Sequence, residues 1–140
     1  MLDLEQIKRI IPHREPFVLI DTIEELEPGV SAIGTKYVNS SEDYFKGHFP
    51  KNPVMPGVLI IEALAQTGAV ALLSLEQFKG KTAFFGGIDK VRFRKQVVPG
   101  DTLKLAIEII KLKGSVGVGK AIAYVKNEKA VEAELTFAIG

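Results

Sequence analysis

The chain has 140 residues, of which 46% are hydrophobic and 25% are charged, as expected for an ordinary globular protein with one hydrophobic core. Its formal net charge of +1 excludes a strongly basic nucleic-acid-binding protein. It has no cysteine, which excludes disulfides, a thiol nucleophile and a cysteine metal site, and two histidines are too few for an ordinary zinc site. We expect residues 1–140 to form a single domain.

The sequence has no pattern typical of secretion or of a membrane span. Its first eleven residues are acidic before they are basic and contain no long apolar stretch. The longest apolar run, residues 58–73, is short for a membrane helix and is interrupted by Glu62 and Gln66. These features predict a cytoplasmic protein, provided that no transit peptide has been removed.

The first part of the chain predicts a short helix, two strands and a long loop. Apolar residues within 2–11 follow helical spacing, and Pro12 ends the pattern. Residues 17–26 and 30–38 are typical of strands, and a Pro-Gly turn signal separates them. Residues 39–56 are rich in Ser, Gly, Pro and Asn, and an ordered loop of this length is typically functional.

A long helix and a series of strands follow. Residues 57–79 are expected to form the helix, which is apolar on every side over most of its length. The later strands are joined by short connections and should therefore pair antiparallel. A curved sheet of five or six strands around the helix would give an α+β fold, with a second subunit covering the remaining helix face. The predicted later strands are residues 82–98, 102–112, 116–126 and 130–139.

His48 is the first candidate for a functional residue. It follows Gly47, which permits close backbone approach, and precedes a segment stiffened by Pro50, Pro53 and Pro56. A rigid loop can hold an imidazole in one orientation, and a neutral imidazole can accept a proton near pH 7. The alternative is a partly buried histidine that is satisfied by a backbone carbonyl. We favour the proton-transfer role.

Glu62 is the second candidate, because a carboxylate inside an apolar helix is costly unless it has a partner or a function. Gln66 lies one turn further on and about 40° around the helix, so both polar groups share a face. A buried carboxylic acid tends to stay protonated and can then donate a proton near neutral pH. The alternatives are a structural carboxylate paired with arginine or lysine, or one that reaches solvent from the helix rim.

Two weaker candidates lie at segment ends. Gly57 stands at the expected helix start, where unpaired amides could bind a ligand carbonyl and stabilise developing negative charge. A glycine that merely eases a tight entry into the helix is at least as good an interpretation. For His13 and Arg14 we favour a structural turn, in which the arginine ties the first helix to the sheet, over a contribution to a site.

The strand that follows the helix carries two further patterns. Lys90, Arg92 and Arg94 alternate with apolar residues, which gives the strand one basic face. That face is a solvated surface by default, or else a docking patch for an acidic partner. A Gly-Gly pair predicts a bulge or a close backbone approach, and Phe84 and Phe85 are candidates either for lining an apolar pocket or for the core.

The chain resembles the (3R)-hydroxyacyl-[acyl-carrier-protein] dehydratases of type II fatty-acid synthesis. The resemblance rests on PHREPFVLID at 12–21, GHFPKNPVMPGVLIIEALAQ at 47–66 and IDKVRFRKQVVPGDTL at 88–103, and it spans nearly the whole chain. It implies a hot-dog fold, in which a curved antiparallel sheet wraps a long helix, and homodimers that commonly associate into hexamers. It implies no metal or redox cofactor.

The resemblance also implies roles for four residues. His48 matches the family's catalytic histidine, and Glu62 matches its catalytic glutamate, which the neighbouring subunit supplies across the dimer. Val54 matches the residue whose backbone carbonyl orients the imidazole, and Gly57 matches the backbone donor to the thioester carbonyl. A related branch that also isomerises a ten-carbon product has aspartate at the position of Glu62, so the glutamate favours the plain dehydratase.

The implied reaction is dehydration of a (3R)-hydroxyacyl thioester, carried on acyl carrier protein, to the trans-2-enoyl thioester. His48 would remove the C2 proton, and Glu62 would protonate or orient the departing hydroxyl; alternatively, His48 shuttles the proton through a water that Glu62 only positions. The acyl tail would lie in an apolar tunnel, and the carrier would meet the basic strand face. The alternatives are a thioesterase on the same fold and an acyl-carrier-binding module without turnover.

Overall fold

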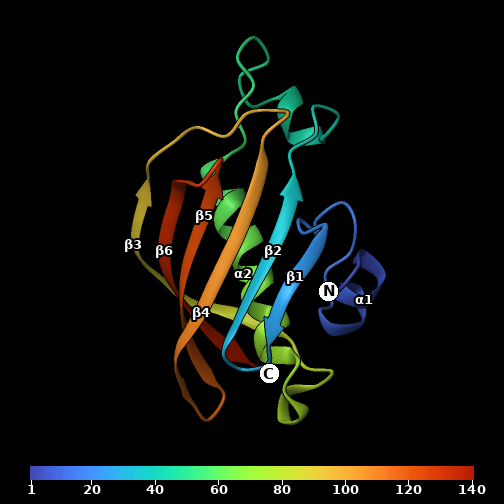
Figure 1. Ribbon diagram of the computed structural model, residues 1–140, viewed down its shortest axis with the longest axis vertical. Coiled ribbons are helices and arrows are strands. Elements are labelled where there is room, and N and C mark those ends of the chain that lie inside the picture. Colours follow the sequence, from blue (N-terminus) through green and yellow to red (C-terminus); the bar gives the residue numbers. More distant parts are fainter.

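One curved antiparallel sheet of six strands wraps around a long helix (Figure 1). The computed structural model describes residues 1–140. The strands are β1 (Thr22–Glu27), β2 (Ser31–Tyr37), β3 (Ala83–Phe93), β4 (Thr102–Lys113), β5 (Val116–Val125) and β6 (Glu128–Ile139). The helices are α1 (Leu4–Ile10) and α2 (Gly57–Leu73), and short 3-10 turns lie at Asp43–Lys46 and Glu76–Phe78. The strand order is β1-β2-β4-β5-β6-β3, so β1 and β3 are the edges.

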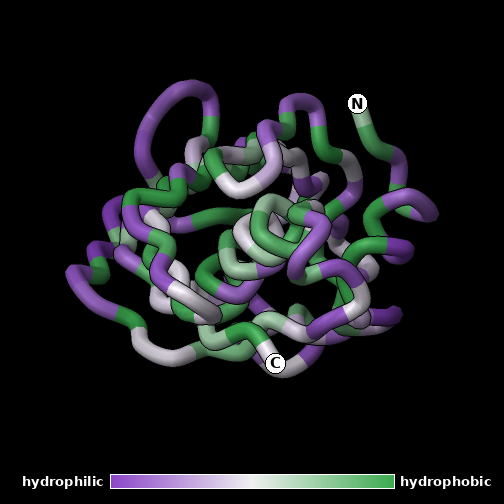
Figure 2. Tube along the Cα trace, turned by 90° about the horizontal axis from the view of Figure 1, so that it is seen from below, coloured by the Kyte–Doolittle hydropathy of each residue, from purple (hydrophilic) through white to green (hydrophobic).

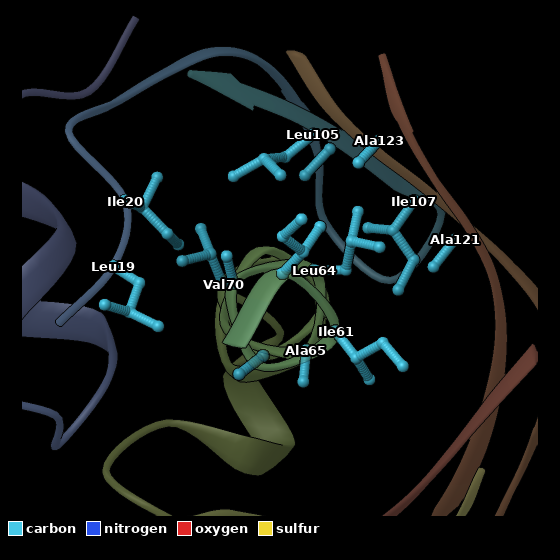
Figure 3. Packing of buried hydrophobic residues seen from close by; sticks show 14 of the residues in the cluster. Leu19, Ile20, Ile61, Leu64, Ala65, Val70, Leu105, Ile107, Ala121 and Ala123 are labelled. Atoms are coloured by element: carbon cyan, nitrogen blue, oxygen red, sulfur yellow. The ribbon is translucent and has the colours of Figure 1, made fainter. Parts of the chain in front are cut away.

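The core lies between the concave face of the sheet and α2. Along β4 every second side chain from Leu103 to Ile107 is buried, which is the alternation expected of a strand with one face inward. Leu64 and Val70 of α2 point into this layer (Figure 3). Gly68 allows the closest approach, since a Cβ there would lie 2.6 Å from both Ile107 Cδ1 and Phe137 Cζ. Each fully buried Leu or Val contributes roughly 1.5–3 kcal/mol relative to an exposed one.

The prediction that the central helix keeps an uncovered apolar face is wrong. Thirteen of the 17 residues of α2 are buried within the single chain, and Figure 2 shows its green coil enclosed by the rest of the trace. The side away from the sheet is covered by Leu19 and Ile20, which precede β1 (Figure 3). The exposed apolar side chains lie instead on the edge strand β3, where Phe84 and Phe93 are 58% and 57% exposed. No helix is both long and apolar enough to cross a membrane.

Three element boundaries differ by several residues from the sequence-based expectations. The helix ends at Leu73 rather than near residue 79, because Leu75 takes an extended conformation with a ψ of 140°. The C-cap residue Ser74 donates from its Oγ to the Val70 carbonyl at 2.6 Å.

The first strand begins at Thr22 rather than at residue 17. The reason is that the side chain of Gln66, on α2, binds the Phe17 carbonyl and the Leu19 amide in place of a neighbouring strand. The third strand also ends earlier than expected, at Phe93.

Candidate functional site

The loop that carries His48 is fixed at both of its ends. The His48 amide donates to the Tyr44 carbonyl at 3.0 Å, and the Met55 amide donates to the Val97 carbonyl at 2.7 Å. Between these anchors Phe49 has a φ of 60°, a left-handed conformation that costs a non-glycine residue roughly 1 kcal/mol or more. The loop is therefore fixed in one conformation, as its three prolines predicted.

His48 is oriented by a backbone carbonyl. Its Nδ1 lies 2.6 Å from the carbonyl oxygen of Val54, the contact that the family resemblance implied for these two residues. A carbonyl oxygen can only accept, so Nδ1 carries the proton and Nε2 of the neutral ring keeps its lone pair. The ring of Phe49 packs against the imidazole with the ring centroids 4.2 Å apart. The tautomer of His48 is thus the one that a proton acceptor requires.

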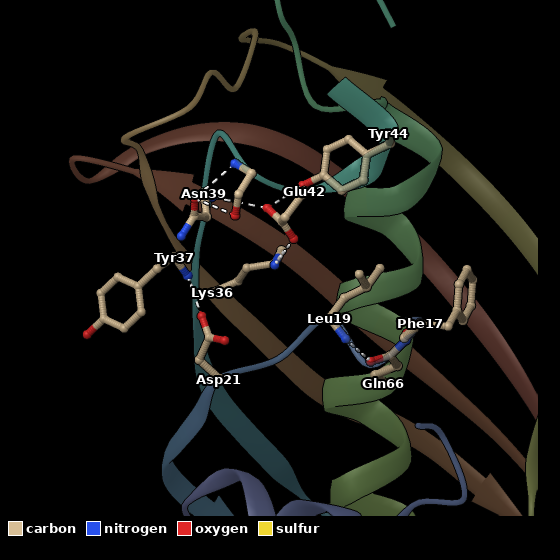
Figure 4. Close-up of polar contacts among 10 residues, drawn as sticks. Phe17, Leu19, Asp21, Lys36, Tyr37, Asn39, Glu42, Tyr44 and Gln66 are labelled. Atoms are coloured by element: carbon tan, nitrogen blue, oxygen red, sulfur yellow. Dashed lines mark hydrogen bonds and ion pairs between the residues drawn. The ribbon is translucent and has the colours of Figure 1, made fainter. Parts of the chain in front are cut away.

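Gln66 holds Glu62 in place. Gln66 is fully buried on α2, and its Nε2 donates to Glu62 Oε2 at 2.9 Å and to the Phe17 carbonyl at 2.8 Å. Its Oε1 accepts from the Leu19 amide at 2.7 Å, so both sides of the amide are used (Figure 4). Glu62 therefore faces the segment before β1, with its side chain 16% exposed.

His13 is the second neighbour of Glu62. Its Nε2 lies 3.4 Å from Glu62 Oε2, while its Nδ1 is buried and has no hydrogen-bond partner. Glu62 Oε1 accepts no hydrogen bond within the chain. The alternative in which an arginine or lysine pairs with Glu62 is not found. The prediction that Arg14 ties the first helix to the sheet is wrong, because Arg14 donates to the carbonyls of Ile11 and His13 within its own turn. From the sequence His13 was interpreted as structural, and its place in the PHREPF stretch was the one signal of another role; the structure places it beside Glu62.

Two cavities lie beside the candidate residues, and they are separate within one chain. Glu62 and His13 line a small cavity of about 30 Å³ together with Phe85. Val54 and Gly57 line a larger one of about 290 Å³ at the start of α2. His48 lines neither of them, and Phe84 lines neither of them. A single chain thus holds the histidine and the glutamate in different surroundings.

Gly57 begins α2 with unpaired backbone donors. The amides of Leu59 and Ile60 donate to the Pro56 carbonyl at 3.0 and 3.3 Å, whereas those of Gly57 and Val58 have no acceptor in the chain. Such free amides carry the positive end of the helix dipole. Because Gly57 also lines the larger cavity, these donors can meet a carbonyl oxygen bound there.

The basic side chains at the end of β3 and just after it are largely paired with glutamates of β6. Arg94 Nε lies 2.9 Å from Glu132, and Lys90 Nζ lies 3.4 Å from Glu134. The hydrogen bond from Arg94 lowers the pKa of the Glu132 carboxyl. Arg92 has no carboxylate partner and donates only to a neighbouring carbonyl at 3.0 Å. These basic side chains therefore carry less unpaired positive charge than the sequence suggests.

No group of three or more His, Cys, Asp or Glu is placed to hold a metal ion.

Known proteins match this chain over nearly its whole length. The FabA-like domain matches residues 11–134. The 3-hydroxyacyl-[acyl-carrier-protein] dehydratase FabZ of Clostridium novyi is 63% identical over 99% of this chain and 98% of its own. That of Clostridium botulinum (strain Okra) is 66% identical over 99% of this chain and 96% of its own.

Solved structures share the hot-dog fold at low sequence identity. A chain of the dehydratase heterocomplex ApeI:P from Xenorhabdus doucetiae has a TM-score of 0.78 at 17% identity, with 96% of this chain and 90% of that chain covered. A hypothetical thioesterase from Streptococcus pneumoniae, solved with coenzyme A, has a TM-score of 0.64 at 15% identity, with 84% and 86% covered. These likenesses establish the fold, and the match over residues 11–134 establishes that the chain belongs to the FabA-like family.

Proposed function

We propose that this chain dehydrates (3R)-3-hydroxyacyl groups carried on acyl carrier protein to trans-2-enoyl groups in fatty-acid elongation. The observation that carries the proposal is the contact of 2.6 Å between His48 Nδ1 and the Val54 carbonyl, which leaves Nε2 able to accept a proton. End-to-end relatives at 63% and 66% identity that are dehydratases of this kind support the substrate class and the reaction.

His48 is the general base of the proposed reaction. Its Nε2 takes the C2 proton, which the adjacent thioester carbonyl makes acidic. The electrons of the C2–H bond form the C2–C3 double bond, and the C3–O bond breaks. The Gly57 amide donates to the thioester carbonyl oxygen and stabilises the enolate charge that develops there. Support for this role comes from the free amide and from the cavity that Gly57 lines.

Glu62 serves the departing hydroxyl. It protonates this group, which leaves as water, or it positions a water through which His48 returns the proton to the hydroxyl. Gln66 and His13 both approach Oε2, so Oε1 is the oxygen left to meet the substrate. Phe85 lines the cavity beside Glu62 and is proposed, with Phe84, to border the path of the acyl tail.

A homodimer is part of the proposal, because one chain keeps His48 and Glu62 in different surroundings. The edge strand β3 is eleven residues long and exposes large apolar side chains, a surface that soluble proteins usually cover. Pairing of two such edges about a twofold axis covers both at once and can bring Glu62 of one chain to His48 of the other. Association of three such dimers into a hexamer is the larger assembly we propose.

Acyl carrier protein is the proposed partner, and its proposed docking surface is the group of basic side chains at the end of β3 and just after it. The acidic carrier would approach Lys90, Arg92 and Arg94, with Arg92 contributing most because no carboxylate of this chain neutralises it. A cytoplasmic location stays a prediction.

An absorbance assay for the enoyl thioester tests the function directly. The protein is mixed with 3-hydroxybutyryl and longer 3-hydroxyacyl groups on acyl carrier protein, and in the reverse direction with crotonyl-carrier protein. A dehydratase changes enoyl absorbance in both directions without releasing thiol. Thiol release without enoyl formation would identify a thioesterase, and carrier binding without either change would identify a non-catalytic module.

A further inference from the structure

A partly buried ion pair lies next to the His48 loop and has no place in the chemistry above. Lys36, on β2, has a side chain that is only 6% exposed, and its Nζ lies 2.6 Å from Glu42 Oε1. Taking two charges out of water is costly, so such a pair adds little net stability unless its geometry is good and further hydrogen bonds complete it. Its value in a protein can lie in fixing one conformation.

Further donors complete this pair. Glu42 Oε2 accepts from the Tyr44 hydroxyl at 2.8 Å and from the Asn39 amide at 3.1 Å (Figure 4). Burial, and then the hydrogen bond to Glu42, raise the pKa of Tyr44, so its hydroxyl remains a donor at neutral pH. Both oxygens of one carboxylate are thus bound by three groups from the end of β2 and the turn that follows. We call Lys36, Asn39, Glu42 and Tyr44 the Glu42 cluster.

The Glu42 cluster is connected to His48 through a single residue. The Tyr44 hydroxyl donates a hydrogen bond to Glu42, while the Tyr44 carbonyl accepts one from the His48 amide at 3.0 Å. The other side of the cluster is anchored in the sheet, since Lys36 pairs with Leu103 of β4. Three contacts therefore link a strand of the sheet, through the partly buried Glu42 carboxylate and then Tyr44, to the backbone of His48.

We propose that the Glu42 cluster positions His48. Lys36, Glu42 and Tyr44 tie the 3-10 turn at Asp43–Lys46 to the sheet, so that the imidazole meets the Val54 carbonyl and presents Nε2 in one direction. None of the three touches the substrate; they are positioning residues, and their effect on turnover rests on the proposed role of His48 as the base. A misplacement of about 1 Å can lower a rate by roughly a hundredfold, so a loosened turn is enough to matter.

Glu42→Gln and Tyr44→Phe test the proposal by kinetics. The first keeps the shape of the side chain without its charge, and the second removes only the hydroxyl donor. Each should lower kcat by about tenfold or more while KM changes less than about twofold, because orientation and not binding is lost. Ile7→Val, at the buried residue of α1, is the control: it destabilises the fold without touching the turn and should leave kcat unchanged. An equal loss of kcat in the control would overturn the proposal.

A second readout does not depend on turnover. The chain has only two histidines, so labelling histidine with ¹⁵N gives two sets of imidazole signals, and His48→Ala identifies the set of His48. In the parent protein these signals should show the proton fixed on Nδ1; in Glu42→Gln and Tyr44→Phe they should move towards averaged tautomers. Unchanged signals in both variants overturn the proposal, even if kcat falls. Changed signals with unchanged kcat support the positioning and contradict instead the role of His48 as the base.

Discussion

The ring of Phe93, on β3, lies directly against Gly57, the first residue of α2. A Cβ built on Gly57 would lie 2.4 Å from Phe93 Cε1 and 2.7 Å from its Cδ1, far inside van der Waals contact. The sequence left two interpretations of this glycine, room for a ligand and ease of helix entry. The structure adds a third reason, which is that an edge strand passes across the helix start.

Gly57→Ala should damage activity more than stability. Phe93 is half-exposed and can rotate away, so the free energy of unfolding should fall by about 1 kcal/mol, the low end for overpacking. The added methyl group enters the cavity proposed for the thioester, and dehydration should fall at least tenfold, about 1.4 kcal/mol of transition-state stabilisation. Thermal unfolding and the enoyl assay measure the two effects. In a protein that already carries Phe93→Ala, the further change Gly57→Ala should still lower the rate of dehydration. If the rate did not fall further, the only role of Gly57 would be to leave room for the Phe93 ring.

His48→Ala and Glu62→Ala should each lower dehydration by at least roughly a hundredfold, because each removes a partner in proton transfer. Both side chains are partly exposed, so circular dichroism and thermal unfolding should show a folded protein. A His48→Ala protein that turns over within about tenfold of the parent would end the general-base assignment.

Glu62→Asp separates reach from acidity. Aspartate keeps the acid but withdraws it by one methylene, away from Gln66 Nε2, which now lies 2.9 Å from Glu62. The rate should fall less than in Glu62→Ala, because the chemistry remains and only its placement suffers. Comparison of kcat for the two variants gives the answer. A loss as deep as that of Glu62→Ala would show that reach is limiting.

Mixing inactive His48→Ala and Glu62→Ala proteins should restore activity if subunits can exchange. In a mixed dimer with shared sites, one of the two sites contains both intact groups, so an equal mixture should regain about a quarter of parental activity. The enoyl assay after exchange, with heterodimers verified by native mass spectrometry, provides the measurement. Verified heterodimers without activity would mean that both groups act from one chain.

Gln66→Leu should lower the free energy of unfolding by about 2–4 kcal/mol, because it leaves the Leu19 amide and the Phe17 carbonyl without partners in the interior. Urea denaturation measures the change. Thr67→Val, also buried on α2, removes only a hydrogen bond to a carbonyl of its own helix and should cost less than about 1 kcal/mol. Equal losses in the two variants would contradict the bridging role of Gln66.

The hot-dog fold could be predicted from the sequence because its signals are local. Short connections between the predicted later strands indicated antiparallel pairing of β4, β5 and β6, and the apolar helix required a wrapping sheet. The stretch at residues 17–19 could not be assigned correctly, since its apolar residues look the same whether a strand or a helix side chain takes their backbone hydrogen bonds. Only the distant position of Gln66 decides this.

The candidate site was predicted in part for a similar reason. The stiff loop before Pro56 predicted an oriented His48. This signal is local, because the Val54 carbonyl that orients the imidazole is only six residues away in sequence. His13 was interpreted as structural because nothing local reveals that the chain returns to Glu62, 49 residues later. The unpaired positive charge of Lys90 and Arg94 was overestimated, since their glutamate partners lie on a strand about forty residues further on.

The last strand of the chain is an interior strand of the sheet: β6 lies between β5 and β3, and Ala83 pairs with Ile139. During synthesis, β3 therefore has no neighbour in the sheet until the C-terminal residues have left the ribosome. The apolar helix α2 is synthesised before the four strands, β3 to β6, that cover it in the folded protein. Closure of the fold is thus a late, long-range event, and until it occurs the nascent chain exposes both an apolar helix and an unpaired strand, the two surfaces that chaperones bind and aggregates grow from.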